Sequence, residues 1–200
     1  MRTPVTEKKE RSLGVKLFMK AERCNSPKCA TVRRQSRPGM HGTRRKNMTE
    51  YGTQLQEKQK IQISYGLNNT QMQKLFARYN PEEIMDLLTH RLDQVVFIIG
   101  FARSPSIGRQ LVTHGHIMVN GRRVNIPSYQ VQKGDVVEIR PESKEMKLFE
   151  GLRERFKNYD MPVWFSLNAD TLAATCVRHA TKEDMQFPFN IDVVGQFYSR

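Results

Sequence analysis

The basic residues of this chain are concentrated in its first sixty positions, in a region with little apolar surface to bury. Residues 1–60 hold 16 lysines and arginines against 5 acidic residues, whereas residues 61–200 hold 17 against 15. No acidic residue lies between Arg33 and Lys46, and a Pro-Gly pair and a further glycine interrupt any helix there. Such a segment cannot offset its own ordering entropy, so we expect it to be mobile until a polyanion holds it. The folded core must come from the rest of the chain.

The net charge of +13 and its uneven distribution indicate a polyanionic partner, either nucleic acid or an anionic membrane. A membrane surface requires an amphipathic helix with a bulky apolar face, which the proline and glycines of the basic segment disfavour. The longest apolar run, residues 95–102, is too short to span a bilayer, and residues 1–8 lack the apolar run of a secretory signal. Three cysteines give no even disulfide framework, so we expect a reducing compartment. Nucleic acid is therefore the expected partner, with no membrane and no small-molecule substrate.

Helix start signals recur along the middle of the chain. Thr49 can cap a helix that runs to about residue 65, and residues 70–73 form a capping box before a second helix. Asn80-Pro81 and Ser104-Pro105 each combine an N-cap residue with a proline at the first helical position. Apolar residues follow each start at helical spacing, which predicts that each helix buries one face in a core.

A small sheet is predicted after the last of these helices. Asn120-Gly121 separates two short β-prone runs, and a type I′ turn favours this pair because both of its central residues take positive φ. A second turn at residues 133–135 leads to a strand over residues 136–139. Residues 91–140 are therefore predicted to form two helices backed by a small twisted sheet.

The remainder of the chain is balanced in charge and less clearly patterned. We predict a helix over residues 144–159, an extended segment at residues 162–164 with Trp164 as a packing anchor, and a further strand from the alternation of Phe187, Phe189, Ile191 and Val193. The predicted fold class is α+β, with an extended basic N-terminal segment. Its parts are a basic extension at 1–48, a helical body at 49–90 and 146–200, and a two-helix, twisted-sheet module at 91–145.

Six segments within the module are distinctive as a set. They are Arg91-Leu-Asp93, Arg109-Gln-Leu-Val112, His114-Gly-His-Ile117, residues 119–124, Ile126-Pro-Ser-Tyr129 and Gly134-Asp135. Together they resemble the small RNA-binding domain named after the ribosomal protein four family of the small subunit. The resemblance extends almost end to end, through Gly14-Val-Lys-Leu17, residues 38–42, residues 57–60 and the terminal Phe197-Tyr-Ser-Arg200.

This resemblance implies a primary rRNA-binding protein of the small ribosomal subunit, in a bacterial cytoplasm or an organelle matrix. It implies neighbouring small-subunit proteins as partners and an early role in assembly. It further implies that Arg44, Arg45 and Lys46 line the channel through which mRNA enters. The chain departs from the family pattern after Ser104, where relatives usually carry arginine and this chain has Pro105 and Ser106. Arg103 is a candidate substitute.

The module's polar residues also suggest an RNA-binding ridge without the family name. The helix that begins at Ser104 carries Arg109, the hairpin adds Arg122 and Arg123, and Tyr129 offers an aromatic face. Adjacent strand residues point to opposite faces, so one arginine of the pair can instead be a structural ion-pair partner. The candidate RNA-binding residues are Lys28, Arg33, Arg34, Arg37, His41, Arg44, Arg45, Lys46, Tyr51, Lys58, Lys60, Arg103, Ser104, Arg109, Gln110, His114, His116, Arg122, Arg123 and Tyr129.

The cysteines leave one metal alternative open. Cys24 and Cys29 could form half of a tetrahedral zinc site, which needs four nitrogen or sulfur ligands. Zinc-bearing relatives place a second cysteine pair near the N-terminus, where this chain has Glu7 and Glu10. We therefore predict no cofactor, with zinc at a doubtful half-site as the alternative.

Two other functions compete with the ribosomal one. Arg91-Leu-Asp93 is similar to the catalytic motif of pseudouridine synthases, some of which carry this module, but only about sixty residues follow the module, too few for their catalytic domain. His114 and His116 have no acid or serine partner within their segment, so a catalytic pair is disfavoured. A free RNA chaperone is the third alternative. We predict that the protein is not an enzyme.

Overall fold

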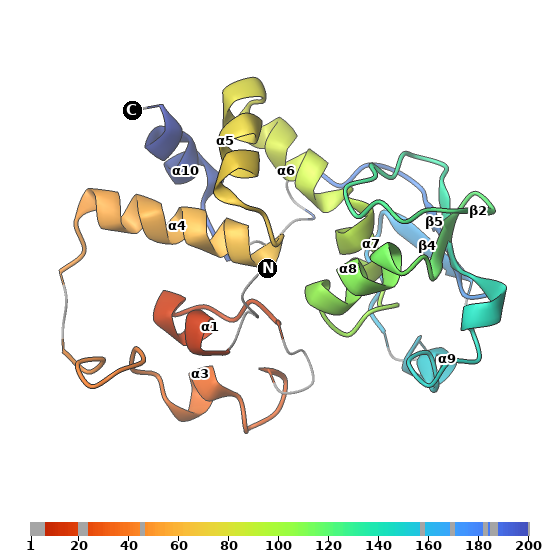
Figure 1. Ribbon diagram of the computed structural model, residues 1–200, viewed down its shortest axis with the longest axis horizontal. Helices are drawn as coiled ribbons and strands as arrows, with labels where there is room; N and C mark the ends of the chain where they lie inside the picture. The colour runs from red at the N-terminus through yellow and green to blue at the C-terminus, as the bar shows by residue number, and fades with distance from the viewer. Residues whose placement is uncertain are drawn as a thin grey trace. The chain divides into compact units, whose positions relative to one another are not determined.

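In the computed structural model the described part of the chain comprises residues 7–19, 24–44, 47–156, 159–168, 171–181, 184 and 188–199. The α+β fold contains two compact units, one formed by residues 1–85 with 187–200 and the other by residues 86–186 (Figure 1). No helix within the described residues combines the length and the apolar character that crossing a bilayer requires.

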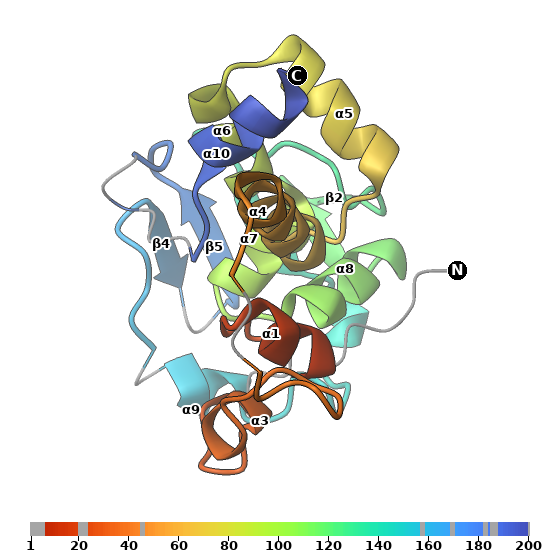
Figure 2. The same cartoon turned by 90° about the vertical axis from the view of Figure 1, so that its left-hand side faces the viewer.

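The first unit is helical (Figure 2). Its elements are α1 (Glu7–Leu13), α3 (Ala30–Arg33), α4 (Glu50–Ser64), α5 (Asn69–Arg78), the start of α6 (Pro81–Thr89) and α10 (Ile191–Tyr198). Helix α10 packs against α4 and α5, and α1 contacts α3. Ile61, Met72 and Val194 are fully buried, so the consecutive helices α4 and α5 share this core with α10 from the end of the chain.

The starts of α4 and α5 show how local chemistry sets their limits. The Thr49 side chain accepts a hydrogen bond from Gly52 N at 3.2 Å, which confirms the predicted N-cap. The capping box of α5 lies two residues before the predicted one, because Asn68 accepts from Gln71 N at 2.7 Å and the Gln71 side chain accepts from Asn68 N at 3.0 Å. Asparagine is at least as good an N-cap as threonine, so the helix begins at the earlier position.

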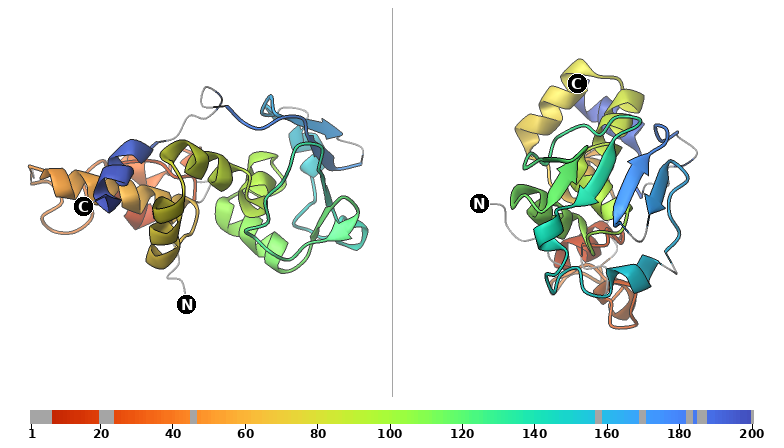
Figure 3. Two further views of the ribbon diagram at one scale, coloured as in Figure 1. Left: turned by 90° about the horizontal axis from the view of Figure 1, so that it is seen from above. Right: turned by 90° about the vertical axis from the view of Figure 1, so that its right-hand side faces the viewer.

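The second unit places helices beside a five-stranded antiparallel sheet (Figure 3). The helices are α7 (Leu92–Ile98), α8 (Pro105–Thr113), a 3₁₀ turn η1 (Pro141–Ser143) and α9 (Leu152–Phe156). The strands are β1 (Ile117–Val119), β2 (Arg122–Arg123), β3 (Val136–Ile139), β4 (Phe165–Asn168) and β5 (Ala173–Cys176), in the order β2-β1-β3-β5-β4. Helices α7, α8 and α9 share one apolar core with the sheet, and Trp164 is buried in it as predicted.

The predicted helix start and hairpin of the module are confirmed. The Ser104 side chain caps α8, with proline at its first position, and Gly115 follows the helix at a φ of +72°. Asn120 and Gly121 take φ values of 51° and 72°, as a type I′ turn requires. The turn sets β1 and β2 in register, with Val119 opposite Arg122.

The module's sheet continues beyond residue 145, because β4 and β5, in the range assigned by sequence to the helical body, extend it. Strand β5 pairs with β3, with Val137 opposite Ala174, and both Ala174 and Cys176 are fully buried. Two of the four residues of β5 are alanines, which are depleted in strands, so the local strand signal is weak. The pairing with β3 therefore determines this strand.

Two secondary-structure predictions near the C-terminus are wrong. Residues 144–159 do not form one helix, since α9 is the only helical part of the residues described in this range. Ile191 and Val193 lie in α10 and not in a strand, because the Asn190 side chain accepts from Asp192 N and Val193 N and starts a helix. A short alternation of apolar residues also fits one side of a helix packed against a core. Phe187 lies outside the described residues.

Candidate nucleic-acid interface

Close packing of α7 against α8 determines which side of α8 is exposed. A Cβ atom at Gly108 would lie 2.6 Å from the Asp93 carbonyl oxygen, so only glycine permits this approach. Leu111 and Val112 are buried in the core, whereas Gln110, Thr113 and His114 are exposed. The polar side of α8 is therefore held on a rigid element.

Arg109 is anchored on its inner side by a buried carboxylate. Asp93 is 1% exposed and accepts hydrogen bonds from Arg91 Nε at 3.1 Å and Arg91 Nη2 at 2.8 Å. Arg109 Nη1 lies 3.5 Å from Asp93 Oδ2, and the Arg109 side chain is 37% exposed. The Asp93 carboxylate thus orients the Arg109 guanidinium, whose other side faces solvent.

The hairpin joins this surface through Arg123. Arg123 Nη2 donates to the His114 carbonyl at 3.2 Å, a favourable place for a cation because it is the C-terminal end of α8. A Cβ atom at Gly115 would collide with the Arg123 guanidinium, so the glycine makes room for this contact. Both Arg122 and Arg123 are exposed. We call the surface formed by Arg109, Gln110, His114 and Arg123 the module ridge.

The other module residues that were predicted to bind RNA differ in their exposure to solvent. Ser104 is buried, and its hydroxyl accepts from Ile107 N at 3.4 Å as the cap of α8. Tyr129 is half-buried against the core, and its carbonyl accepts from Leu92 N at 2.8 Å. Arg103 is exposed just before the cap. Ser104 therefore supports the ridge instead of contacting RNA through its side chain.

His116 is half-buried and hydrogen-bonds to Ser143 Oγ at 2.9 Å. Burial lowers the pKa of His116 below its ordinary value of 6.5, and the neighbouring His114, Arg123 and Arg140 lower it further. The unfolded chain therefore binds more protons than the folded chain just below pH 6.5, so stability rises with pH in that window. Replacing His116 by asparagine, which keeps a hydrogen-bonding side chain, should remove this part of the pH dependence.

Urea unfolding of both proteins between pH 5 and pH 7 measures this difference. We expect the wild-type protein to lose stability on acidification more steeply than His116→Asn over that range. Equal slopes for the two proteins would contradict the assigned role of His116. Asp184 is not a confounding group, because its ion pair with Arg178 lowers the pKa of that carboxyl well below this range.

A second set of exposed cations lies in the helical unit, on α3 and the turns that follow it. Arg11 fixes this segment, since its guanidinium donates to the Arg34 carbonyl at 3.1 Å and to the Ser36 carbonyl at 2.8 Å. Sequence reasoning missed this role of Arg11, because nothing local marks a contact between residues so far apart. The exposed predicted residues here are Lys28, Arg33, Arg34, Arg37, His41 and Arg44. Arg45 and Lys46 lie outside the described residues.

A groove of about 410 Å³ lies in the same unit, between the end of α1 and the start of α4. Arg37, Thr49, Gln56 and Gln59 are among the residues that line it. Gln56 Nε2 donates to the Leu13 carbonyl at 2.7 Å, which ties the two helices together. The groove thus combines a cation with neutral polar groups.

Lys58 and Lys60, which were predicted to bind RNA, are both largely buried in the helical unit. Lys58 is buried with its Nζ 4.4 Å from the centroid of the Phe197 ring and 5.1 Å from that of Tyr198. Burial lowers the pKa of Lys58. Lys60 is buried and its Nζ lies 2.6 Å from Glu57 Oε1. Tyr51 stays 53% exposed while contacting Phe197. Lys58 thus joins α4 to the rings of α10, whereas Lys60 forms an ion pair within α4.

The two N-terminal cysteines are both buried. Cys24 Sγ lies 3.8 Å from Glu10 Oε2, and Glu10 Oε1 accepts from Leu17 N and Met19 N. Cys29 Sγ lies 2.9 Å from Thr31 Oγ1, a contact that lowers the pKa of the Cys29 thiol. Glu10 thus organises the loop after α1 around Cys24.

Comparisons with known proteins cover nearly the whole chain. Residues 90–137 match the family described as S4 domain, and residues 3–83 match the Ribosomal protein S4/S9 N-terminal domain. The small ribosomal subunit protein uS4 of Halothermothrix orenii is 42% identical over 193 residues, covering 94% of this chain and 93% of the relative. That of Thermus thermophilus is 41% identical with the same coverage, and that of Gloeobacter violaceus is 42% identical over 95% of this chain and 94% of the relative.

Proposed function

Because the chain belongs to the family of small ribosomal subunit protein uS4, we propose that it is a structural constituent of the small ribosomal subunit that binds small-subunit rRNA. One observation carries this proposal beyond the family name. The module ridge holds its arginines on rigid elements, with Arg109 oriented by a buried carboxylate and Arg123 by the end of α8. Preoriented guanidinium groups suit the recognition of phosphates at fixed spacing.

The proposed mechanism is electrostatic clamping of an rRNA helix junction. A-form RNA hides its base edges in a deep, narrow groove, so a protein recognises the shape and the phosphates of a junction more readily than its sequence. The module ridge and the exposed arginines of the helical unit supply two basic surfaces for this purpose. Nucleation of subunit assembly, contacts with neighbouring small-subunit proteins and a place for Arg44 at the channel through which mRNA enters are part of the same proposal.

The segment Arg91-Leu-Asp93 is similar to the catalytic motif of pseudouridine synthases. Its geometry fits a protein that binds RNA without catalysing a reaction. The Asp93 side chain is 2% exposed and is occupied by Arg91 and Arg109. A carboxylate held in this way is not available to a nucleotide substrate. This placement favours the binding role over the pseudouridine synthase alternative.

Co-sedimentation tests the proposed function and separates it from a free RNA chaperone. The full-length chain is mixed with small-subunit rRNA or with large-subunit rRNA at several salt concentrations. We expect it to pellet with small-subunit rRNA at salt concentrations that release it from large-subunit rRNA. Equal retention on both RNAs at every salt concentration would favour the chaperone.

A further inference from the structure

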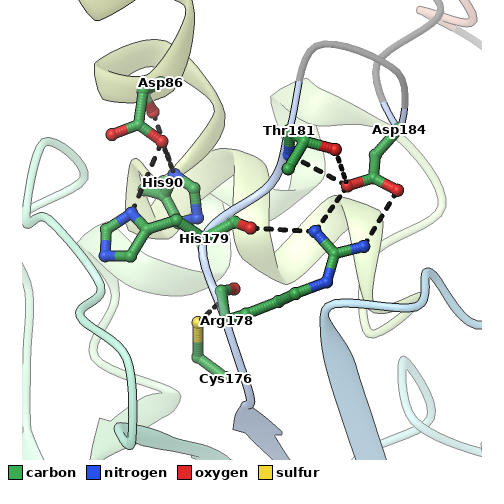
Figure 4. Close-up of polar contacts among 7 residues, drawn as sticks. All are labelled: Asp86, His90, Cys176, Arg178, His179, Thr181 and Asp184. Atoms are coloured by element: carbon green, nitrogen blue, oxygen red, sulfur yellow. Dashed lines mark hydrogen bonds and ion pairs between the residues drawn. The ribbon is translucent and has the colours of Figure 1, made fainter.

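Three side chains with metal-ligating atoms converge at the C-terminal end of α6, all within the 86–186 unit (Figure 4). Asp86 and His90 are four residues apart, which places them on the same side of the helix end. His179 comes from the segment that follows β5. The ligand atoms of the three residues all lie within 4.8 Å of one another. We propose that Asp86, His90 and His179 form a binding site for a divalent cation of the zinc class.

The distances in this cluster fit shared coordination. Asp86 Oδ1 lies 2.9 Å from His90 Nδ1 and 3.4 Å from His179 Nδ1. A tetrahedral zinc ion with bonds of about 2.0–2.1 Å separates its ligand atoms by about 3.3–3.4 Å. The three atoms therefore need only small side-chain shifts to reach one ion. The half-exposed His179 and Asp86 side chains have the freedom to make those shifts.

Burial of His90 provides a second observation. Its side chain is 3% exposed, and its Nδ1 faces both the Asp86 carboxylate and the Asp86 carbonyl oxygen at 3.0 Å. Its other nitrogen, Nε2, is buried and has no hydrogen-bond partner among the described residues. Hydrogen bonding within the protein therefore leaves this imidazole only partly satisfied, while packing fixes its Nδ1 toward the carboxylate. An ion bound at Nδ1 would replace the contact of this nitrogen with Asp86 by a bond to the metal.

The neighbouring cation does not compete for the site. Arg178 precedes His179, but its guanidinium points to the opposite side of the segment, where Nη1 and Nη2 bind Asp184 at 2.6 and 3.0 Å (Figure 4). Thr181 also donates to Asp184, from both its backbone N and its hydroxyl. The loop is thus held independently of the cluster, and the charge of Arg178 is neutralised.

The donor set selects the class of ion. Two imidazole nitrogens and one carboxylate oxygen suit zinc and similar divalent transition metals, whereas magnesium and calcium prefer oxygen ligands alone. Three protein ligands leave one tetrahedral position for water or a group of the RNA. Such an ion would join the end of α6 to the segment after β5.

Zinc titration of the full-length, metal-stripped chain tests the proposal. The protein carries Cys24→Ser and Cys29→Ser, so that the two N-terminal thiolates cannot account for binding. We expect one zinc ion per chain by calorimetry and a cobalt spectrum without sulfur charge-transfer bands. His179→Ala should weaken zinc binding by more than about tenfold, because it removes one of three ligands. His114→Ala, which removes an exposed histidine of the same unit, should leave the affinity for zinc unchanged.

Three outcomes would overturn the site: no zinc binding by the protein with the two cysteine substitutions, equal zinc affinity of His179→Ala and its parent, or equal binding of magnesium and zinc. Asp86→Asn is the second variant, so a folding defect of one variant does not decide the result. Far-UV circular dichroism of the metal-free proteins checks their folding. The affinity for small-subunit rRNA is a separate readout, so failure of the metal site leaves the proposed function standing.

Discussion

Replacing the four exposed arginines Arg33, Arg34, Arg37 and Arg44 together by glutamine should weaken the binding of small-subunit rRNA by about 100- to 1,000-fold at physiological salt. Each phosphate contact contributes about 0.7–0.9 to the slope of log affinity against log salt, so the slope should fall by about 3. Because the electrostatic contribution vanishes near 1 M salt, this change in slope corresponds to about two to three orders of magnitude at 0.15 M. Filter binding over a range of salt concentrations measures both quantities.

The control for this experiment is Lys58→Met. It removes a charge of the same unit that sequence reasoning also assigned to RNA, but this ammonium is buried over the Phe197 ring. We expect its salt slope to equal that of the wild-type protein. A wild-type slope for the four-arginine variant, or a reduced slope for Lys58→Met, would contradict the assignment of the binding surface. Circular dichroism confirms that each variant is folded at the assay temperature.

Replacing Asp93 by alanine should lower the free energy of unfolding of the 86–186 unit by about 3–5 kcal/mol. The change leaves the Arg91 guanidinium, which is 10% exposed, without its carboxylate, and breaking a buried ion pair from one side has a cost of this size. Trp164 is the one tryptophan of the chain and lies in the core of this unit. Its fluorescence during urea unfolding therefore reports the effect.

Two further variants show whether the effect belongs to the buried pair. Replacing both partners, as Arg91→Met with Asp93→Leu, should recover much of the lost stability, because neither charge then remains buried alone. Glu142→Gln breaks the exposed ion pair with Arg140 and should leave the unfolding curve unchanged. A loss of less than about 1 kcal/mol for Asp93→Ala would show that Arg91 finds other partners and that the pair is not the anchor of the ridge.

The module was predictable because its signals are local. A cap with proline starts α8 at Ser104, and Asn120-Gly121 closes the hairpin, so chain neighbours a few residues apart decide both features. The resemblance to the ribosomal family was also readable, because it depends on the order of short segments. Arg122 and Arg123 are both exposed, and their contact with RNA stays a prediction.

The errors arise where distant parts of the chain meet. Lys58 and Lys60 look like surface lysines of a polar helix, and only the docking of α10 encloses the first over an aromatic ring. Strand β5 and helix α10 depend in the same way on partners far along the chain. The cluster of Asp86, His90 and His179 has no sequence signature, since 89 positions separate its two histidines.

By itself the sequence determined the family, the basic character and the local elements of the module, because caps, turns and charge depend on residues adjacent in the chain. Only the tertiary structure decided which cations face solvent, which strands complete the sheet and which side chains meet around Asp86 and Asp93. Burial and ion pairing are properties of contacts between distant residues. A pattern along one chain does not contain them until the chain is folded.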